Sequence, residues 1–272
     1  MNSAVELVIV THASKTLPEY GRNDILKYPG APGVDLMKEV IDNIEKYTGI
    51  TKKSIVFDHK VDCETSRAYL RNLTLLCEKN DIKFKVSPSS LAMPSQITAS
   101  NAFLMAVDQC DSEYLLLWEH DHLFLEAINW DAVENAFLAG LKMVRFNRSV
   151  NQSQGDHVLE RISPLPGLKG LCRTNYYCNG PFVAKTKWCK KLFKKAALEI
   201  PSWNGCFGGF IEGPINRIMI RDELNLSSEQ FISKYPICLY GEEGSPPIVA
   251  HFGDFPGRRA RFIAHLKSLL NR

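Results

Sequence analysis

The chain has 272 residues, of which 45% are hydrophobic and 23% charged, and its net charge is +3. This composition indicates a globular protein with a sizeable core, and the small net charge argues against nucleic acid as a partner. Because the sequence contains neither a signal peptide nor the roughly 18–20 apolar residues that cross a bilayer, we expect a soluble cytoplasmic protein whose eight cysteines stay reduced.

Strands and helices alternate through the first half of the chain. The apolar run ELVIVT at residues 6–11 predicts a buried strand, and the apolar spacing over residues 34–47 predicts an amphipathic helix. The same patterns predict further strands at 54–57, 83–86, 114–118 and 143–146, and further helices at 64–78, 95–109 and 130–139. This alternation is typical of βαβ crossovers, so we expect an α/β fold with a mainly parallel central sheet flanked by helices.

The second half is richer in loops, because Gly and Pro become frequent after residue 150. Helices are predicted at 185–198, 213–224 and 258–270, and a strand is predicted at 236–240. Repeats, low-complexity tracts and linkers are absent from the sequence. We therefore expect a single domain over residues 1–272.

Several polar residues follow the predicted strands directly. Thr11 and His12 end the first strand, Asp58 and His59 end the second, and residues 119–122 end the strand at 114–118. Ligands of open α/β sheets bind at the carboxyl ends of the strands. The sequence thus places its unusual polar residues where this fold builds its site.

The stretch YLLLWEHDHLF at residues 114–124 is the most informative of these. In an extended segment Glu119 and Asp121 point to one face, and His120 and His122 to the other. Two carboxylates on one face repel each other unless a cation lies between them, and Mg²⁺ or Mn²⁺ is bound in this way beside substrate phosphates. The alternative is a solvated turn whose charges meet water.

In its layout the whole chain resembles the GT-A glycosyltransferases, most closely those of family 2. The resemblance rests on SNAFLMAVDQC, a helix that precedes the strand, and on EYLLLWEHDH, a strand ending in an Asp-x-Asp-like motif. Glu119 stands where that family usually has its first Asp. The resemblance implies a nucleotide-sugar-binding half over 1–125 and an acceptor-side half over 126–272, with Mn²⁺ or Mg²⁺ held by Asp121 and Glu119 on the donor's diphosphate.

Two further segments fit this resemblance. In CNGPFVAKTKW, Asn179 and Gly180 would lie beneath the donor sugar, although an ordinary tight turn explains them equally well. In IVAHFGDFPGRRAR, His251 would be a third metal ligand, and Arg258 and Arg259 would neutralise the leaving diphosphate. The nucleoside and ribose would bind near these donor-site residues: Thr11, His12, Ala13, Asp58, Arg67 and His120.

The stretch WNGCFGGFIEGPINR supplies the candidate catalytic acid. Gly209 lets the backbone approach a ligand closely, and Glu212 stands in an apolar setting just before a predicted helix. Glu212 is either a first-turn acid favoured by the helix dipole or, as the resemblance implies for inverting enzymes, the general base. An apolar environment would raise its pKa toward neutrality, as a base requires.

These observations predict a metal-dependent glycosyltransferase that moves a sugar from a UDP-sugar or similar donor to a glycan or glycoconjugate hydroxyl, with inversion. The rivals are a retaining GT-A enzyme, a catalytically silent sugar-binding relative, and a metal-dependent hydrolase built from His12, His120, Asp121, His122 and His251. A nucleotidyltransferase would share the sheet, but the first predicted strand is not followed by a Gly-rich phosphate loop. The basic stretch KTKWCKKLFKK at 185–195 would suit peripheral contact with a membrane or simply form a solvated helix face.

Overall fold

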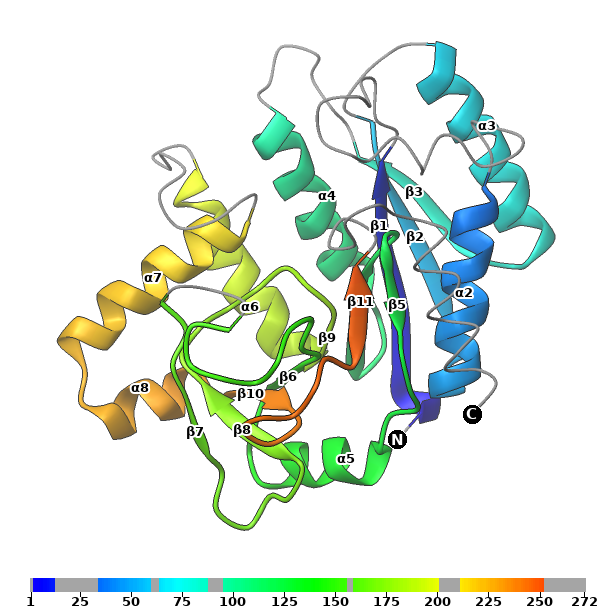
Figure 1. Cartoon of the computed structure of the whole chain (residues 1–272). Coiled ribbons are helices and arrows are strands. Elements are labelled where there is room, and N and C mark those ends of the chain that lie inside the picture. Colours follow the sequence, from blue (N-terminus) through cyan, green and yellow to red (C-terminus); the bar gives the residue numbers. More distant parts are fainter. Residues whose placement is uncertain are drawn as a thin grey trace.

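A computed structural model describes residues 2–12, 34–59, 64–87, 95–155, 159–200 and 211–251 (Figure 1). The strands are β1 (Val5–His12), β2 (Lys53–Asp58), β3 (Lys83–Ser87), β4 (Tyr114–Glu119), β5 (His122–Phe124), β6 (Met143–Arg145), β7 (Ile162–Pro164), β8 (Leu171–Thr174), β9 (Phe182–Lys185), β10 (Ile237–Tyr240) and β11 (Val249–His251). The helices are the 3₁₀ turn η1 (Asn2–Ala4), α2 (Asp35–Thr48), α3 (Glu64–Lys79), α4 (Ser95–Gln109), α5 (Trp130–Leu138), α6 (Thr186–Ala197), α7 (Glu212–Asn225) and α8 (Ser228–Lys234).

Among the described residues, nine strands form one sheet in the order β3-β2-β1-β4-β9-β6-β10-β8-β7. The strands β3, β2, β1 and β4 are mutually parallel, and β6 pairs in parallel with β10. The strand β9 runs antiparallel between β4 and β6, and β8 runs antiparallel between β10 and β7. The predicted α/β fold with a helix-flanked central sheet is confirmed, and the sheet is mixed because two strands of the second half enter it reversed.

The sheet buries a hydrophobic core on each face, as the βαβ alternation predicts. On β1, Leu7 and Ile9 pack on the α2 and α3 side, whereas Val8 and Val10 pack on the α4, α6 and α7 side. The apolar residues of β4 alternate in the same way. Figure 1 shows α2 and α3 on one side of β1 and β2, with α4, α6 and α7 on the other.

The mixed topology brings the important loops to one edge of the sheet. The carboxyl ends of β1, β2, β4 and β6 lie at this edge because these strands share one direction. Since β9 is reversed, its amino end, preceded by Asn179 and Gly180, lies there too. The segments that sequence reasoning singled out therefore converge.

The sequence patterns did not predict a second, two-stranded sheet made of β5 and β11. The antiparallel pair places His251 directly opposite His122. Asn43 of α2 holds β5 in place, since its Oδ1 accepts from Phe124 N at 2.7 Å and its Nδ2 donates to Phe124 O at 3.0 Å. This two-stranded ribbon places β11, the last described strand, beside the turn that follows β4.

The other predicted elements that fall on described residues are present with ends shifted by a few residues at most. Sequence patterns missed η1, β5, β7, β8, β9, β11 and α8, which are all short. The predicted helix at 258–270 lies outside the described residues. The nine-stranded sheet takes strands from both halves of the described chain, and the single domain over 1–272 stays a prediction.

The described part of the chain contains no helix long and apolar enough to cross a membrane. Six cysteines lie in this part, and each is a buried free thiol. Cys63 and Cys206 fall outside the described residues, and the reduced state of the eight cysteines stays a prediction.

Candidate metal centre and active site

The chain reverses sharply at the end of β4. Strand β4 ends at Glu119, residues His120 and Asp121 form a turn, and His122 opens β5. The indole Nε1 of Trp118 donates to His122 O at 2.9 Å and so fastens the turn. The turn presents Asp121 at the carboxyl edge of the sheet, where an α/β fold binds its ligands.

Asp121 lies between two imidazoles. Its Oδ1 is 3.1 Å from His122 Nδ1, and its Oδ2 is hydrogen-bonded to His251 Nε2 at 3.1 Å. The rings of His122 and His251 have centroids 4.6 Å apart. One ligand atom from each of the three residues lies within 4.8 Å of the others, so the cluster could hold a metal ion.

Charge and burial in this cluster suit a cation. Burial opposes the ionisation of Asp121, but His122 and His251 overcome this effect and hold the pKa of the carboxyl well below its usual range. Burial also lowers the pKa of His122 to about 4, against the opposing effect of Asp121. His122 is thus a neutral imidazole near pH 7, which is the form that binds metals.

The hydrogen bonding of the cluster points the same way. Within the described part of the chain, Nε2 of His122 is buried and has no hydrogen-bond partner. Buried polar atoms are nearly always paired with a protein group, a water or an ion. One carboxylate and two imidazoles are donors that divalent transition metals accept, so these three residues fit a bound metal ion.

The structure corrects the pairing expected for the Glu-His-Asp motif. Strand alternation ends at Glu119, so Asp121 and His122 are not on opposite faces as predicted, and His122 joins the cluster. Glu119 continues the alternation of Leu115 and Leu117, whose side chains pack in the core on the α4, α6 and α7 side. Among the described residues, Glu119 is not one of the metal-cluster groups.

The predicted nucleoside region lies beside this cluster. The rings of His12 and His120 meet edge to face, with centroids 5.0 Å apart. Thr11 and Asp58 are buried at the ends of β1 and β2, and the Thr11 hydroxyl is hydrogen-bonded to Tyr69 OH at 2.9 Å. The structure therefore gives Thr11 a structural contact that the sequence did not indicate.

Five predicted donor-site residues are either exposed or outside the part of the chain that the structure describes. Arg67 is exposed in the first turns of α3. Four predicted residues, Ala13, Gly209, Arg258 and Arg259, lie outside the described residues. Their roles stay predictions.

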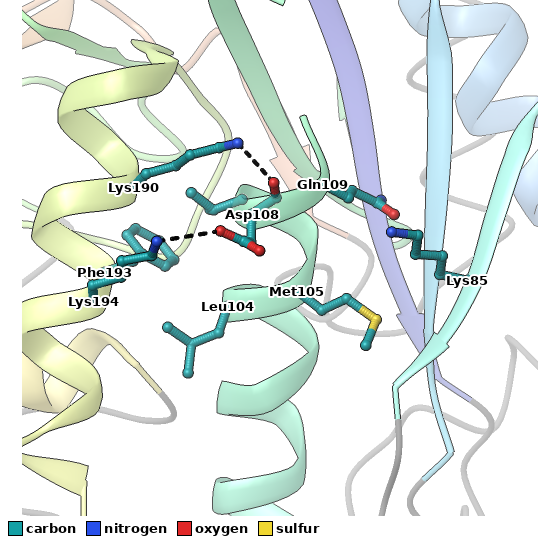
Figure 2. A pocket seen from close by; sticks show the side chains of 9 residues that line it. Lys85, Leu104, Met105, Asp108, Gln109, Lys190, Phe193 and Lys194 are labelled. Atoms are coloured by element: carbon teal, nitrogen blue, oxygen red, sulfur yellow. Dashed lines mark hydrogen bonds and ion pairs between the residues drawn. The ribbon is translucent and has the colours of Figure 1, made fainter. Parts of the chain in front are cut away.

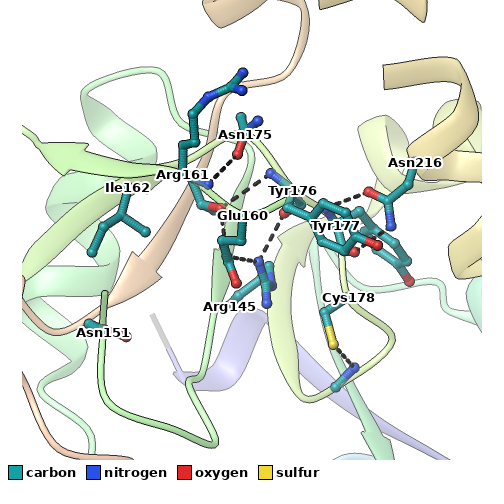
Figure 3. Close-up of polar contacts among 12 residues, drawn as sticks. Arg145, Asn151, Glu160, Arg161, Ile162, Asn175, Tyr176, Tyr177, Cys178 and Asn216 are labelled. Atoms are coloured by element: carbon teal, nitrogen blue, oxygen red, sulfur yellow. Dashed lines mark hydrogen bonds and ion pairs between the residues drawn. The ribbon is translucent and has the colours of Figure 1, made fainter. Parts of the chain in front are cut away.

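Glu212 opens α7 and is 8% exposed. Its Oε2 accepts a hydrogen bond from the backbone N–H of Asn179 at 3.2 Å. One helical turn later, Asn216 Oδ1 accepts from Tyr177 N at 2.9 Å, and Asn216 Nδ2 donates to Tyr177 O at 2.8 Å. The start of α7 thus holds the segment 177–180 by three hydrogen bonds, which we call the α7 grip. Figure 3 shows the two that Asn216 makes with Tyr177.

Burial raises the pKa of Glu212 to about 7. The N–H of Asn179 and the charges of Arg145 and Arg148 oppose this rise, and the charge of Glu160 adds to it. A carboxyl that titrates near neutral pH is suited to accept a proton from a substrate hydroxyl. The apolar setting inferred from sequence thus has the expected electrostatic consequence, while the catalytic role stays a prediction.

A buried ion pair between Arg145 and Glu160 lies near this segment (Figure 3). Arg145 Nη1 donates to Glu160 Oε1 at 2.6 Å and to Tyr176 O at 2.9 Å. The Thr174 hydroxyl donates to the same Glu160 oxygen at 2.7 Å. The guanidinium of Arg145 is therefore engaged by Glu160 and the Tyr176 carbonyl.

Sequence reasoning missed two residues that organise the site, Asn147 and Asn216. Asn147 O accepts from the N–H groups of Ile248 and Val249, both at 3.2 Å, at the start of the strand that carries His251. Asn147 Nδ2 donates to Ser149 O and Pro246 O. An isolated Asn gives little sequence signal for such a role, because Pro246, Ile248 and Val249 lie about 100 residues further along the chain.

Basic side chains also line a separate groove of about 390 Å³ between α4, α6 and β3 (Figure 2). Lys190 donates to Asp108 O at 2.7 Å, and Lys194 Nζ is 3.7 Å from Asp108 Oδ1. The groove lies near the end of α4, just before β4 begins, and so toward the sheet edge opposite Asp121. These lysines are engaged with α4 and do not belong to the candidate site.

Comparison with known proteins identifies the fold but no family. The sequence matches no protein-family model and no curated protein. A solved structure of a proposed glucose-1-phosphate thymidylyltransferase from Bacillus anthracis, in complex with a sucrose, superposes with a TM-score of 0.52 at 9% identity, covering 98% of this chain and 96% of that one. A nucleotidyl transferase from Methanothermobacter thermautotroptrophicus gives a TM-score of 0.48 at 11% identity, covering 98% of each chain.

The first of these likenesses shows a shared α/β fold. It does not single out the family 2 glycosyltransferases that the sequence resembles.

Proposed function

We propose that this protein is a metal-dependent glycosyltransferase that moves a sugar from a nucleoside-diphosphate donor, most simply a UDP-sugar, to a hydroxyl of a glycan or glycoconjugate. The observation that carries the proposal is the buried cluster of Asp121, His122 and His251 at the carboxyl edge of the sheet. Glu212, with a pKa raised to about 7 by burial, lies at the start of a helix that contacts the same edge.

Asp121, His122 and His251 would hold the divalent cation. When bound, such an ion offsets the negative charge of a diphosphate, including the charge that develops on the phosphate oxygen released from the sugar. Two imidazole donors favour Mn²⁺ or a similar transition metal over Mg²⁺, which prefers oxygen ligands. Of the two ions expected from sequence, we therefore favour Mn²⁺.

Glu212 would act as the general base in a single displacement. The acceptor oxygen forms a bond to the anomeric carbon while its proton passes to the Glu212 carboxylate. The bond from that carbon to the phosphate oxygen breaks, and its electron pair leaves with the diphosphate. The Asn179 N–H donates to Oε2 of Glu212 and so orients the carboxyl group at the sheet edge. In a retaining enzyme Glu212 would orient the acceptor without taking its proton.

A second candidate is a metal-dependent hydrolase, favoured by a specific feature of the same edge. His12 and His120 lie ring to ring, and the charge of His120 acts on Asp121 beside His122 and His251. Water would then replace the acceptor hydroxyl, and Glu212 would have no part in the chemistry. A Glu212→Gln variant separates the two candidates, because it would stop transfer and leave hydrolysis unchanged.

The decisive experiment offers a panel of nucleotide-sugars and simple glycan acceptors with Mn²⁺, Mg²⁺ or EDTA, and identifies the nucleotide product. Glycosyl transfer releases a nucleoside diphosphate in a Mn²⁺-dependent reaction. A nucleotidyltransferase, the activity for which the structurally similar proteins are named, would instead join a sugar 1-phosphate to a nucleoside triphosphate and release pyrophosphate. If no donor is consumed and none raises the melting temperature, the proposal fails.

A further inference from the structure

The outer face of α6 carries a stripe of lysines. Lys187, Lys191 and Lys194 are exposed and spaced four and three residues apart, so they lie in one row along the helix. Four residues further on, Leu198 ends the row with a side chain that is 83% exposed. The opposite face of α6 is buried in the core, and the helix TKWCKKLFKKAA contains no acidic residue. The charge of this lysine stripe is therefore not balanced within the helix.

Acids on α4 neutralise little of this charge. Within the described part of the chain, Lys187 and Lys191 make no hydrogen bond or ion pair. Lys190 donates to the backbone carbonyl of Asp108, and Lys194 Nζ lies 3.7 Å from the Asp108 carboxylate (Figure 2). The side chains of Lys194 and Asp108 are 74% and 67% exposed, and exposed pairs of this kind are weak.

Acids on the α7 side of the stripe are each shared between two basic groups. Asp222 Oδ2 lies 2.8 Å from Lys234 Nζ and 3.7 Å from Lys195 Nζ. Glu199, just after α6, lies 3.2 Å and 3.9 Å from two arginines of α7. The acids that pair with this surface thus meet basic groups at least equal to them in number, and the surface keeps a positive charge.

We infer that the outer face of α6 docks on an anionic lipid surface, with the lysine stripe against the phosphate and carboxylate headgroups and Leu198 in the headgroup layer. Lysine is depleted in protein–protein interfaces, whereas rows of lysine with an adjoining apolar side chain are typical of surfaces that bind anionic lipid. Each ammonium is a point charge on a flexible stem, which suits headgroups that have no fixed arrangement. The inference goes beyond the proposed function and does not depend on its metal or its donor.

The test measures co-sedimentation of the full-length protein with vesicles of phosphatidylcholine alone, or with about 30% phosphatidylserine added. The variants are Lys187→Gln/Lys191→Gln and Leu198→Ser. The matched control is Lys46→Gln/Lys79→Gln, which removes the same charge from exposed lysines of α2 and α3, on the other side of the sheet. All of these side chains are exposed, so the melting temperatures should agree and confirm that each variant is folded.

We expect the wild type to bind the anionic vesicles and not the neutral ones, and to be released at high salt. Lys187→Gln/Lys191→Gln should bind about 30-fold more weakly, because each lysine near such a surface strengthens binding about fivefold. Leu198→Ser should weaken binding by up to about tenfold, and the control double variant should match the wild type.

The inference is overturned if the wild type does not bind anionic vesicles, or if the two double variants lose the same affinity, which would show a general effect of net charge. Binding to polyglutamate but not to vesicles would assign the stripe to an acidic protein and also overturn it. None of these outcomes touches the proposed function, because transfer between a nucleotide-sugar and a soluble acceptor is measured without lipid.

Discussion

His251 lies directly opposite His122 across the antiparallel pair of β5 and β11, with Asp121 in contact with both. Directly opposed residues in such a pair have Cβ atoms about 4.5–5.5 Å apart, so the ribbon itself sets the distance between the two imidazoles. The strand register therefore brings the side chains of this candidate metal site together. A shift of one residue in β11 would move His251 to the other face of the ribbon.

The first prediction concerns metal choice. Because two of the three donors are imidazoles, the protein should bind Mn²⁺ or Zn²⁺ more tightly than Mg²⁺. His122→Ala should reduce Mn²⁺ affinity by at least about 100-fold, since loss of an outer-shell partner alone costs 10- to 100-fold. Calorimetric titration of metal-free protein measures this directly.

The matched control for that titration is His59→Ala, a histidine after β2 whose ring stacks on Phe57. Its affinity for Mn²⁺ should equal that of the wild type. Tighter binding of Mg²⁺ than of Mn²⁺, or an unchanged His122→Ala titration, would show that the cluster is not the metal site.

The second prediction concerns the pH dependence of stability caused by Glu212. Its pKa is raised from 4.5 to about 7 by burial, so the folded state binds more protons than the unfolded state between these values. The free energy of unfolding should fall as pH rises through this window, by up to about 3 kcal/mol. Below pH 4.5 this contribution is fully present, and above pH 7 it is lost.

Urea unfolding of the wild type and of Glu212→Gln across pH 4–8 checks this sign. The amide cannot ionise, so the variant should lose the slope and become the more stable protein above pH 7. For a glycosyltransferase, the wild-type rate should rise with pH through about 7, as the base loses its proton. Equal slopes in the two proteins would mean that Glu212 titrates normally.

The sequence predicts the local features of this site and misses the long-range ones. The alternation of strands and helices, the site at the carboxyl edge, and the setting of Glu212 are local signals, and the predictions drawn from them agree with the fold. The placement of His122 beside Asp121 was not predicted, because strand alternation was extended past Glu119, where the chain turns. The ribbon of β5 and β11 pairs segments about 130 residues apart, and three-residue strands carry too little pattern to be seen.

The third prediction concerns the buried pair of Arg145 and Glu160, whose side chains are each 2% exposed. Glu160→Gln leaves a buried guanidinium without its counter-charge, which typically destabilises a protein by about 3–5 kcal/mol. Glu223→Gln, at the exposed pair with Arg161, removes the same group and should change stability by about 1 kcal/mol or less. Chemical unfolding at constant pH compares the two, and similar losses would show that the buried pair is not structural.

The last prediction concerns Asn216, which sits one helical turn after Glu212. Asn216→Ala removes both hydrogen bonds to the Tyr177 backbone and leaves two buried polar groups unpaired. Each such group costs about 1–3 kcal/mol. Because the same grip sets the loop against Glu212 through Asn179 N–H, the variant should also lower kcat more than it changes KM for the donor.

Asn216→Asp is the matched variant for this grip, because it keeps the acceptor for Tyr177 N–H and loses the donor to Tyr177 O. Because its second carboxyl oxygen would face Tyr177 O in a buried site, it should lose at least as much stability as Asn216→Ala. If Asn216 only supports the fold, kcat will follow the fraction of folded protein, and working well below the melting temperature will restore it. If it positions Glu212, kcat stays low in fully folded protein and the pH at which the rate rises shifts away from about 7, because the Asn179 N–H that moderates the Glu212 pKa has moved.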